Sequence, residues 1–179
     1  MHKRNVNLQL LALFAAFALL LTGCKIATGY PQFWFDGIGK AEPEAYLTEE
    51  GFSGLRVGDF AIVPMLKVVY TNTYAMDFVG YSYQNDVSVT LRHIELGRGD
   101  EVLLSEDIDL PFSCQAETDG VSEYVVRALC VPIETLNPAA GEVFYLKAVV
   151  CVEAGGTTQE AELAYTAQIT QYKTLVFQT

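Results

Sequence analysis

The sequence predicts an all-β protein: an antiparallel, immunoglobulin-like β-sandwich of about eight or nine strands that follows an N-terminal apolar helix. Three observations lead to this prediction. Short apolar runs recur at intervals of roughly 8–12 residues and are separated by turn residues. Several of these runs alternate apolar and polar residues, as half-buried strands do. After the N-terminus, no stretch has the length and period of a long helix.

The composition fits one such domain and excludes several classes of protein. The chain has 179 residues, of which 51% are apolar and 18% are charged, so it can bury a core and is not disordered throughout. The net charge of −11 argues against nucleic-acid binding, because contacts with phosphates require a basic surface. We therefore expect a single folded domain that does not bind nucleic acid.

The N-terminal segment has three parts. Positions 2–4 are basic, and an unbroken apolar run, LLALFAAFALLL, extends from Leu10 to Leu21. A membrane-spanning helix requires about 20 such residues, so this shorter run has the length of a signal-peptide core. The motif Leu21-Thr22-Gly23-Cys24 follows directly. It resembles the lipobox of bacterial lipoproteins, in which a leucine, a small residue and a glycine or alanine precede an obligatory cysteine.

This resemblance implies a lipid anchor. Residues 1–23 would be a lipoprotein signal peptide that is cleaved before Cys24, and Cys24 would carry diacylglycerol on its thiol and an acyl chain on its new amine. The residue after the cysteine is Lys25. An aspartate at that position retains enteric lipoproteins at the inner membrane, so its absence favours the outer membrane, facing the periplasm. An ordinary secretory signal and an uncleaved helical anchor remain as alternatives.

Residues 24–53 are predicted to form a lipid-anchored tether, because glycines and prolines interrupt it repeatedly. Four aromatic residues stand close together in it: Tyr30, Phe33, Trp34 and Phe35. One interpretation is that the tether folds back and caps one end of the sandwich. The other is that these aromatic residues form an interface for an envelope protein, since exposed aromatics act as binding anchors. Residues 43–50 have the composition of two helical turns.

The β-sandwich domain is predicted to occupy residues 54–179. The strands expected there cover residues 60–70, 75–83, 87–92, 101–105, 108–112, 124–133, 143–152, 158–169 and 172–177. Pro64 marks a bulge or an edge strand. The pair 143–152 and 158–169, around Gly155-Gly156, is the best-defined hairpin. Because the single tryptophan lies outside these strands, the term immunoglobulin-like describes architecture and not family, and a small closed barrel is the alternative.

Sequence motifs for catalysis and metal binding are missing. The chain contains no G-x-S-x-G, C-x-x-C or H-E-x-x-H motif and no phosphate-binding glycine loop. His93 continues the apolar face of Val87, Val89 and Leu91, where a lone histidine is more often a hydrogen-bonded structural residue than a ligand. We therefore predict no catalytic residues, no metal and no cofactor.

The densest acidic run is Glu106-Asp107-Ile108-Asp109. Asp107 and Asp109 are expected on one face of a strand, where two carboxylates could bind a hard cation such as Ca²⁺ or act as the acid pair of a glycosidase. Alternating acids on a strand are more often its solvated face. We therefore expect no metal site at these positions.

Three cysteines remain after Cys24, so at most one intramolecular disulfide is expected in an oxidising compartment. If Asp119-Gly120 is a tight turn, Cys114 lies opposite Val125, and a symmetric next hairpin would place Cys151 level with Val125 as well. In a flat sheet these two cysteines would still be about 10 Å apart, so a Cys114–Cys151 bridge requires Cys114 to lie in a loop that folds over the sheet end. This bridge is the first expectation, three free thiols are the second, and any bridge to Cys130 is the last. Cys130 is expected to be a small buried core residue.

Taken together, these features predict a lipid-anchored envelope lipoprotein whose β-sandwich acts as a binding or assembly module in the periplasm. Its partners would be the membrane, through the N-terminal lipid, and an envelope protein. Two alternatives remain: an envelope hydrolase or glycan-acting enzyme that uses Asp107 and Asp109, and a purely structural lipoprotein.

Overall fold

A computed structural model describes residues 24–28, 32–35, 38, 41–70, 73–170 and 173–177. These residues fall into two compact units, one from the two ends of the chain and one from Pro31–Thr170. In the first unit, strand β1 (Cys24–Thr28) pairs antiparallel with β12 (Lys173–Phe177). Within the described part of the chain, no helix is long and apolar enough to cross a membrane.

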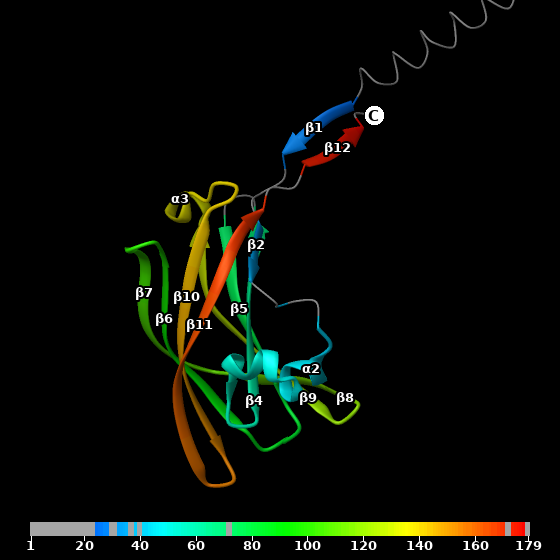
Figure 1. Ribbon diagram of the computed structural model, residues 1–179, viewed down its shortest axis with the longest axis vertical. Coiled ribbons are helices and arrows are strands. Elements are labelled where there is room, and N and C mark those ends of the chain that lie inside the picture. The colour runs from blue at the N-terminus through cyan, green and yellow to red at the C-terminus, as the bar shows by residue number, and fades with distance from the viewer. Residues whose placement is uncertain are drawn as a thin grey trace, which may run out of the picture. The chain divides into compact units, whose positions relative to one another are not determined.

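The second unit is a β-sandwich (Figure 1). Its described residues form two antiparallel five-stranded sheets, in the orders β2-β11-β10-β6-β7 and β3-β4-β5-β9-β8. The strands of the first sheet are β2 (Gln32–Phe35), β6 (Ser88–Arg98), β7 (Glu101–Pro111), β10 (Val143–Ala154) and β11 (Thr157–Thr170). Those of the second are β3 (Arg56–Val57), β4 (Phe60–Tyr70), β5 (Thr73–Ser82), β8 (Ser113–Thr118) and β9 (Val121–Pro132). Three short helical segments accompany them: α2 (Pro43–Thr48), η1 (Glu50–Leu55) and α3 (Ile133–Leu136).

This architecture confirms the predicted all-β sandwich, with two separate sheets in place of a closed barrel among the described residues. The finer immunoglobulin-like description stays a prediction. The β10–β11 hairpin is confirmed, and Gly155 and Gly156 both have positive φ (56° and 77°), as its two-residue turn requires. Among the described residues, β4 pairs at Pro64 only with β5, because the pairing of β3 with β4 stops at Ala61.

The boundaries of the sandwich differ from those predicted. The compact unit begins at Pro31 and ends at Thr170, whereas the sequence predicted 54–179. Residues 32–35 form β2, which pairs with β11 at the edge of the first sheet. Residues 24–53 are therefore not a tether throughout. The predicted strands 101–105 and 108–112 are one strand, β7, while the exposed polar strand β8 was not predicted.

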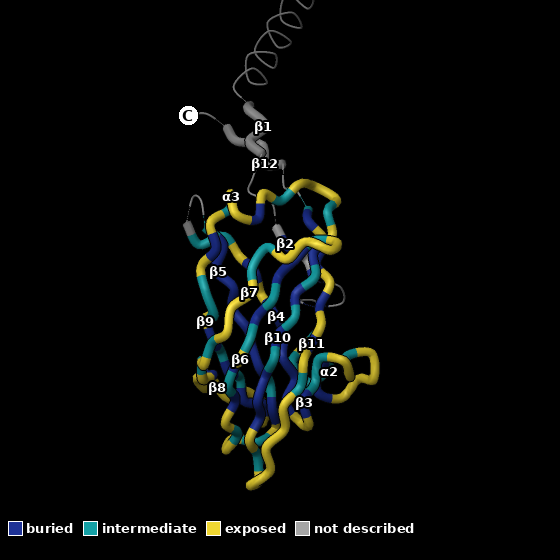
Figure 2. Tube along the Cα trace, turned by 90° about the vertical axis from the view of Figure 1, so that its left-hand side faces the viewer, coloured by how far each residue is buried: buried dark blue, intermediate teal, exposed yellow. Residues whose placement is uncertain are grey.

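The core fills the space between the two sheets, and exposed residues gather at the hairpin tips (Figure 2). Phe33 of β2 packs edge-on against Tyr74 and Phe144, with ring centroids 5.2 and 5.3 Å apart. The buried hydroxyl of Tyr165 in β11 donates a hydrogen bond of 3.2 Å to the carbonyl of Ile62 in β4. Burial also raises the pKa of Tyr165. These contacts join strands from opposite sheets.

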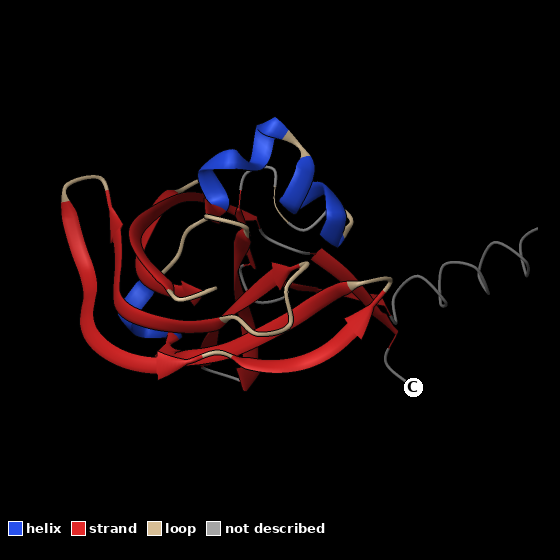
Figure 3. Ribbon diagram, turned by 90° about the horizontal axis from the view of Figure 1, so that it is seen from below, coloured by secondary structure: helices blue, strands red, loops and turns tan. Residues whose placement is uncertain are grey.

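The helical segments α2 and η1 lie next to each other against the strands (Figure 3). Tyr46 of α2 stacks on Tyr81 of β5, with ring centroids 5.8 Å apart, and also contacts Phe52 of η1. The guanidinium of Arg56 donates a hydrogen bond of 2.9 Å to the carbonyl of Leu47. The predicted helix over 43–50 is thus observed as α2, and η1 continues from it.

A register shift at Arg92 changes which residues of β6 face the core. His93 pairs with Val149 of β10 while Leu91 pairs with Val150, so Arg92 is an extra residue in the ladder. Before the shift Leu91 is fully buried, and after it Ile94 is fully buried. His93 therefore leaves the apolar face that the sequence pattern predicted for it.

A second register shift, at Ala128, changes which residues of β9 face the core. Arg127 pairs with Asp77 of β5, and Leu129 pairs with Met76, which leaves Ala128 as the extra residue. As a consequence, the residues of β9 that face the core have even numbers before Ala128 and odd numbers after it. Cys130 falls on the outer face and is exposed, so the prediction that it is a buried core residue is wrong.

Gly80 is the position in β5 where a side chain would not fit. A Cβ atom there would lie 2.2 Å from Cζ of Phe60, whose ring is held by Phe112 and Tyr124. We expect Gly80→Ala to lower the free energy of unfolding by about 1–3 kcal/mol through overpacking. Gly54→Ala is the matched control, because no atom lies within 4 Å of its added Cβ. Urea denaturation measures both, and equal midpoints for Gly80→Ala and wild type would contradict this account.

Candidate functional site

The aromatic residues of β2 belong largely to the core. Phe33 and Phe35 are each 7% exposed and face Ile169 and Ala167 across the β2–β11 ladder. An interface of exposed aromatics therefore does not include these two side chains, because strand pairing turns both toward the opposite sheet. Tyr30 and the side chains of Trp34 and Cys24 lie outside the described residues.

The acids that suggested a cation or glycosidase site each have a basic partner on β6. Nδ1 of His93 and Oδ1 of Asp107 are hydrogen-bonded at 2.7 Å, and Asp109 pairs with Arg92. Among the described residues, no group of three or more His, Cys, Asp or Glu is arranged to hold a metal ion. These contacts describe a charged outer strand face and favour a structural role for both acids.

The expected Cys114–Cys151 bridge is wrong: Cys114, Cys130 and Cys151 are all free thiols. Cys114 lies on β8 in the second sheet and is exposed, whereas Cys151 lies on β10 in the first sheet and is buried. The expectation fails because α3 and the loop after it carry the chain from one sheet to the other. As a result β10 pairs with β6 and β11 instead of β9.

The register of β8 also differs by one residue from the prediction. Asp119 and Gly120 both have positive φ (52° and 80°) and form the predicted tight turn. A shift between Cys114 and Ala116 then places Cys114 opposite Tyr124, where the sequence predicted Val125. An extra residue in the ladder therefore accounts for the difference.

Among the described residues, Asp77 of β5 is the buried charged side chain, 3% exposed. Arg127 donates two hydrogen bonds to its carboxylate, of 2.8 and 3.2 Å, and Nζ of Lys67 lies 2.8 Å from it. Burial alone would raise the pKa of Asp77, but the hydrogen bonds from Arg127 and Lys67 outweigh it and hold the pKa below its usual value. Both cations remain about half exposed, and the cluster ties three strands, β4, β5 and β9, together.

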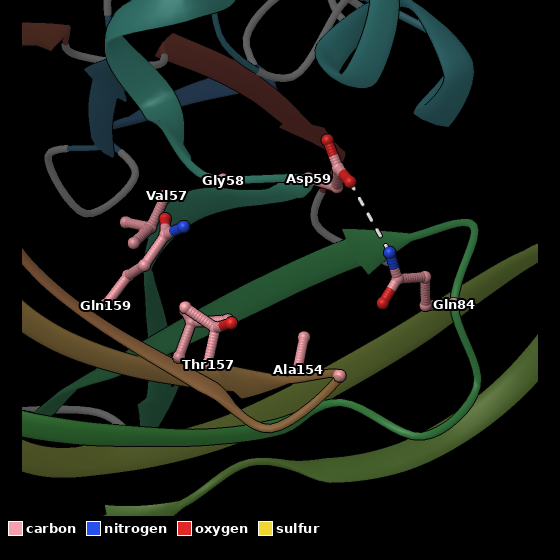
Figure 4. Close-up of a pocket in the computed structure, with 9 residues that line it drawn as sticks. Val57, Gly58, Asp59, Gln84, Ala154, Thr157 and Gln159 are labelled. Carbon is pink, nitrogen blue, oxygen red and sulfur yellow. Dashed lines mark hydrogen bonds between the residues drawn. The ribbon is translucent and has the colours of Figure 1, made fainter.

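A polar cavity of about 390 Å³ lies beside the β3–β4 turn and the β10–β11 hairpin (Figure 4). Asp59 accepts a hydrogen bond of 3.4 Å from the side-chain amide of Gln84, and Thr157 and Gln159 line the opposite wall. Asp59 is the titratable group among the described residues that line it. One hydrogen-bonded carboxylate supplies no acid–base pair, so this cavity offers polar contacts but no evident chemistry.

A second cavity, also of about 390 Å³, is an apolar groove between β7 and β9. We call it the β7–β9 groove; it is lined by Leu104, Glu106, Ile108, Ala128, Leu129, Cys130, Val131, Pro132 and Thr135. Leucine, isoleucine and valine side chains from both sheets therefore meet at a surface that stays open. This groove is the candidate functional site.

The groove runs along an incomplete edge of the second sheet. Strand β8 pairs with β9 only from Val121 to Val125. From Val126 to Pro132, that side of β9 has no strand neighbour among the described residues. In Figure 1 the β8–β9 hairpin accordingly lies at the far end of β9 from α3. Backbone N–H and C=O groups that have no strand partner in the described ranges thus border the apolar lining.

Sequence reasoning did not identify this groove. In the sequence, Glu106 belongs to an acidic run, and Leu129 and Val131 belong to a predicted strand. The groove depends on where β8 stops pairing and on which strand of the other sheet lies opposite. One local sign of the groove is present in the sequence. Leu104, Glu106 and Ile108 occupy alternate positions of the same strand, so an acid stands between two apolar residues on one face.

Comparisons with known proteins add little to this description. No protein-family model matches the chain, and no curated protein matches it. A solved "Crystal structure of protein from Archaeoglobus fulgidus" is similar over 64% of this chain and 95% of that chain. The sequence identity is 12% and the TM-score is 0.34.

The Asp77 cluster makes a prediction about stability and pH. Asp77→Asn should lower the free energy of unfolding by about 2 kcal/mol near neutral pH, because charge-assisted hydrogen bonds to Arg127 and Lys67 are lost. The folded-state pKa is below the usual 3.8, so the carboxylate stabilises the fold above that pH and its contribution is lost as the pH falls below it. Denaturant titrations at neutral pH and at pH values down to below 3.8 should show the free energy of unfolding of the wild type falling toward that of the variant.

The control for this titration is Asp59→Asn, which removes an exposed carboxylate from a turn. Its stability should stay within about 0.5 kcal/mol of wild type at neutral pH. A difference between wild type and Asp77→Asn that stays constant down to the lowest pH would contradict the role given to the Asp77 carboxylate.

The thiols should differ in reactivity according to their burial. In the native protein, a hydrophilic alkylating reagent should modify Cys114 and Cys130, while Cys151 should react only after unfolding. Peptide mass mapping under non-reducing conditions measures this directly. A disulfide-linked Cys114–Cys151 peptide pair would show that the sheet assignment of β8 or β10 is wrong.

Proposed function

We propose that this chain is a lipid-anchored envelope lipoprotein whose β-sandwich is a binding module. The observation that carries the proposal is the motif Leu21-Thr22-Gly23-Cys24 directly after an apolar run of signal-peptide length. Cys24 is the lipid attachment site. The absence of aspartate at position 25 favours the outer membrane, facing the periplasm.

Physical chemistry supports separate roles for the lipid anchor, which holds the chain at the membrane, and for the acidic domain, which binds partners. Each buried CH₂ of an acyl chain contributes about 0.8 kcal/mol, and two or more chains give stable anchoring without further contacts from the protein. Cleavage before Cys24 would remove Lys3 and Arg4 and no acid, so the remaining chain is even more acidic. Anionic headgroups repel such a domain, which leaves its surface free to meet other envelope proteins.

The β7–β9 groove supports the binding role. It combines half-buried apolar side chains with a strand edge that has no strand neighbour among the described residues, two features that proteins use to hold partners. Asp107 and Asp109 are engaged with His93 and Arg92, which favours a binding module over a hydrolase built on these acids.

The anchor is tested by Cys24→Ala. Without the thiol, lipid cannot be attached before cleavage, so the variant should accumulate as an unlabelled precursor when cells are fed a radioactive fatty acid. Cys114→Ala is the matched control, since it removes an exposed thiol from β8 and should keep full label. Equal label on wild type and Cys24→Ala would overturn the proposal.

A further inference from the structure

We infer that the β7–β9 groove binds an extended segment of another protein, which adds a strand to β9 and places a basic side chain against Glu106. This inference rests on the binding role proposed above and names the class of partner. In the proposed segment every second residue is polar, and the residues between them are, in order, apolar, basic and apolar. Strand addition of this kind is a recurring mode of peptide recognition.

The backbone of β9 provides the first contact. β8 leaves β9 after Val125, and the stretch from Val126 to Val131 has no neighbour on that side among the described residues. Its alternate N–H and C=O groups can therefore pair with an incoming chain, as β8 does with the first part of the same strand. An incoming strand of about six residues would match the length of this edge.

The walls of the groove select the side chains that face inward. Leu129 and Val131 of β9 pair with the core residues Met76 and Tyr74 of β5, so they too face the first sheet. Leu104 and Ile108 of β7 line the other wall. Apolar side chains of an added strand would cover these residues and remove apolar surface from water.

Glu106 sets the requirement for a cation. It pairs with Ile94 of β6, whose side chain is fully buried, so Glu106 projects on the core side of its sheet, between Leu104 and Ile108. The side chain of its neighbour Asp107 has His93 as a partner, whereas the side chain of Glu106 has no hydrogen bond or ion pair among the described residues. An apolar strand would desolvate this carboxylate without compensation, and a lysine or arginine would pair with it.

Charge also decides between the alternative occupants. The chain carries a net charge of −11, so two copies repel each other, while a basic segment is attracted. An inward-facing charge on an edge strand is a known protection against pairing with other strands. At this groove the same carboxylate excludes apolar strands and accepts one that brings a cation.

The test uses three blocked synthetic peptides and the lipidated chain, residues 24–179, in detergent. The first peptide is Thr-Val-Thr-Arg-Thr-Val-Thr, and the others have glutamate or valine in place of the arginine. Isothermal titration calorimetry should show the arginine peptide binding about tenfold or more tightly than either, the factor expected for one charge-assisted hydrogen bond. Bound peptide should slow alkylation of Cys130, which lines the groove, and leave the exposed Cys114 unaffected.

Variants of Glu106 separate the carboxylate from the rest of the groove. Glu106→Gln should abolish the preference for the arginine peptide, and Glu106→Lys should invert it toward the glutamate peptide. Asp107→Asn is the matched control, because it removes the same charge from the next residue, on the opposite face, and should leave the preference unchanged. Thermal midpoints should stay close to wild type, since the Glu106 side chain is exposed and has no partner within the described part of the chain.

Several results would overturn the inference: no binding of any peptide, equal binding of all three, or an unchanged preference in Glu106→Gln. Self-association of the peptide-free chain with protection of Cys130 would also overturn it, because the occupant would then be a second copy. The anchor is tested separately. Loss of peptide binding with intact lipid label rejects the added strand alone, and absence of label with intact peptide binding rejects the anchor alone.

Discussion

Side chains alternate between the two faces of a strand, and this sandwich depends on every long strand keeping its apolar residues on the side where the sheets meet. A slip of one residue would turn an entire apolar set toward water. β6 and β9 have sequences that do not alternate along their whole length, and each contains one extra residue that resets the phase. Leu91 and Ile94 in β6, and Val126 and Leu129 in β9, face the same core only because Arg92 and Ala128 interrupt the ladders.

Where local pattern and turn chemistry suffice, the sequence predicts the structure well. The alternation from Ala161 to Ile169 and the Gly155-Gly156 turn determine the β10–β11 hairpin without reference to the rest of the chain. β2 is different, because four residues among glycines and prolines carry no recognisable period. Phe33 and Phe35 become a strand only through pairing with β11, which lies more than a hundred residues further along the chain.

The predictions for His93 and the cysteines fail for a related reason. A bulge depends on the fit between neighbouring strands, so the break in alternation within β6 and β9 does not by itself show which residue is the extra one. His93 directly follows the extra residue of β6, and Cys130 lies two residues beyond that of β9, so both were assigned to the wrong face. The pairing predicted for Cys151 fails because the short helix α3, which begins at the last residue of the predicted strand 124–133, carries the chain to the other sheet.

The β7–β9 groove follows from how this fold treats its edges. Long edge strands invite pairing with other chains, and natural sheets protect them by shortening, covering or charging them. Here β8 is short and leaves much of β9 uncovered, while β7 carries Glu106 on its inward side and Asp107 and Asp109 on its outward side. The outward acids are hydrogen-bonded to partners on β6, whereas the side chain of Glu106 has no such partner among the described residues. The open edge is therefore protected by the charge of Glu106 and is not covered by another described strand. A segment of opposite charge would pair with Glu106 and remove this protection.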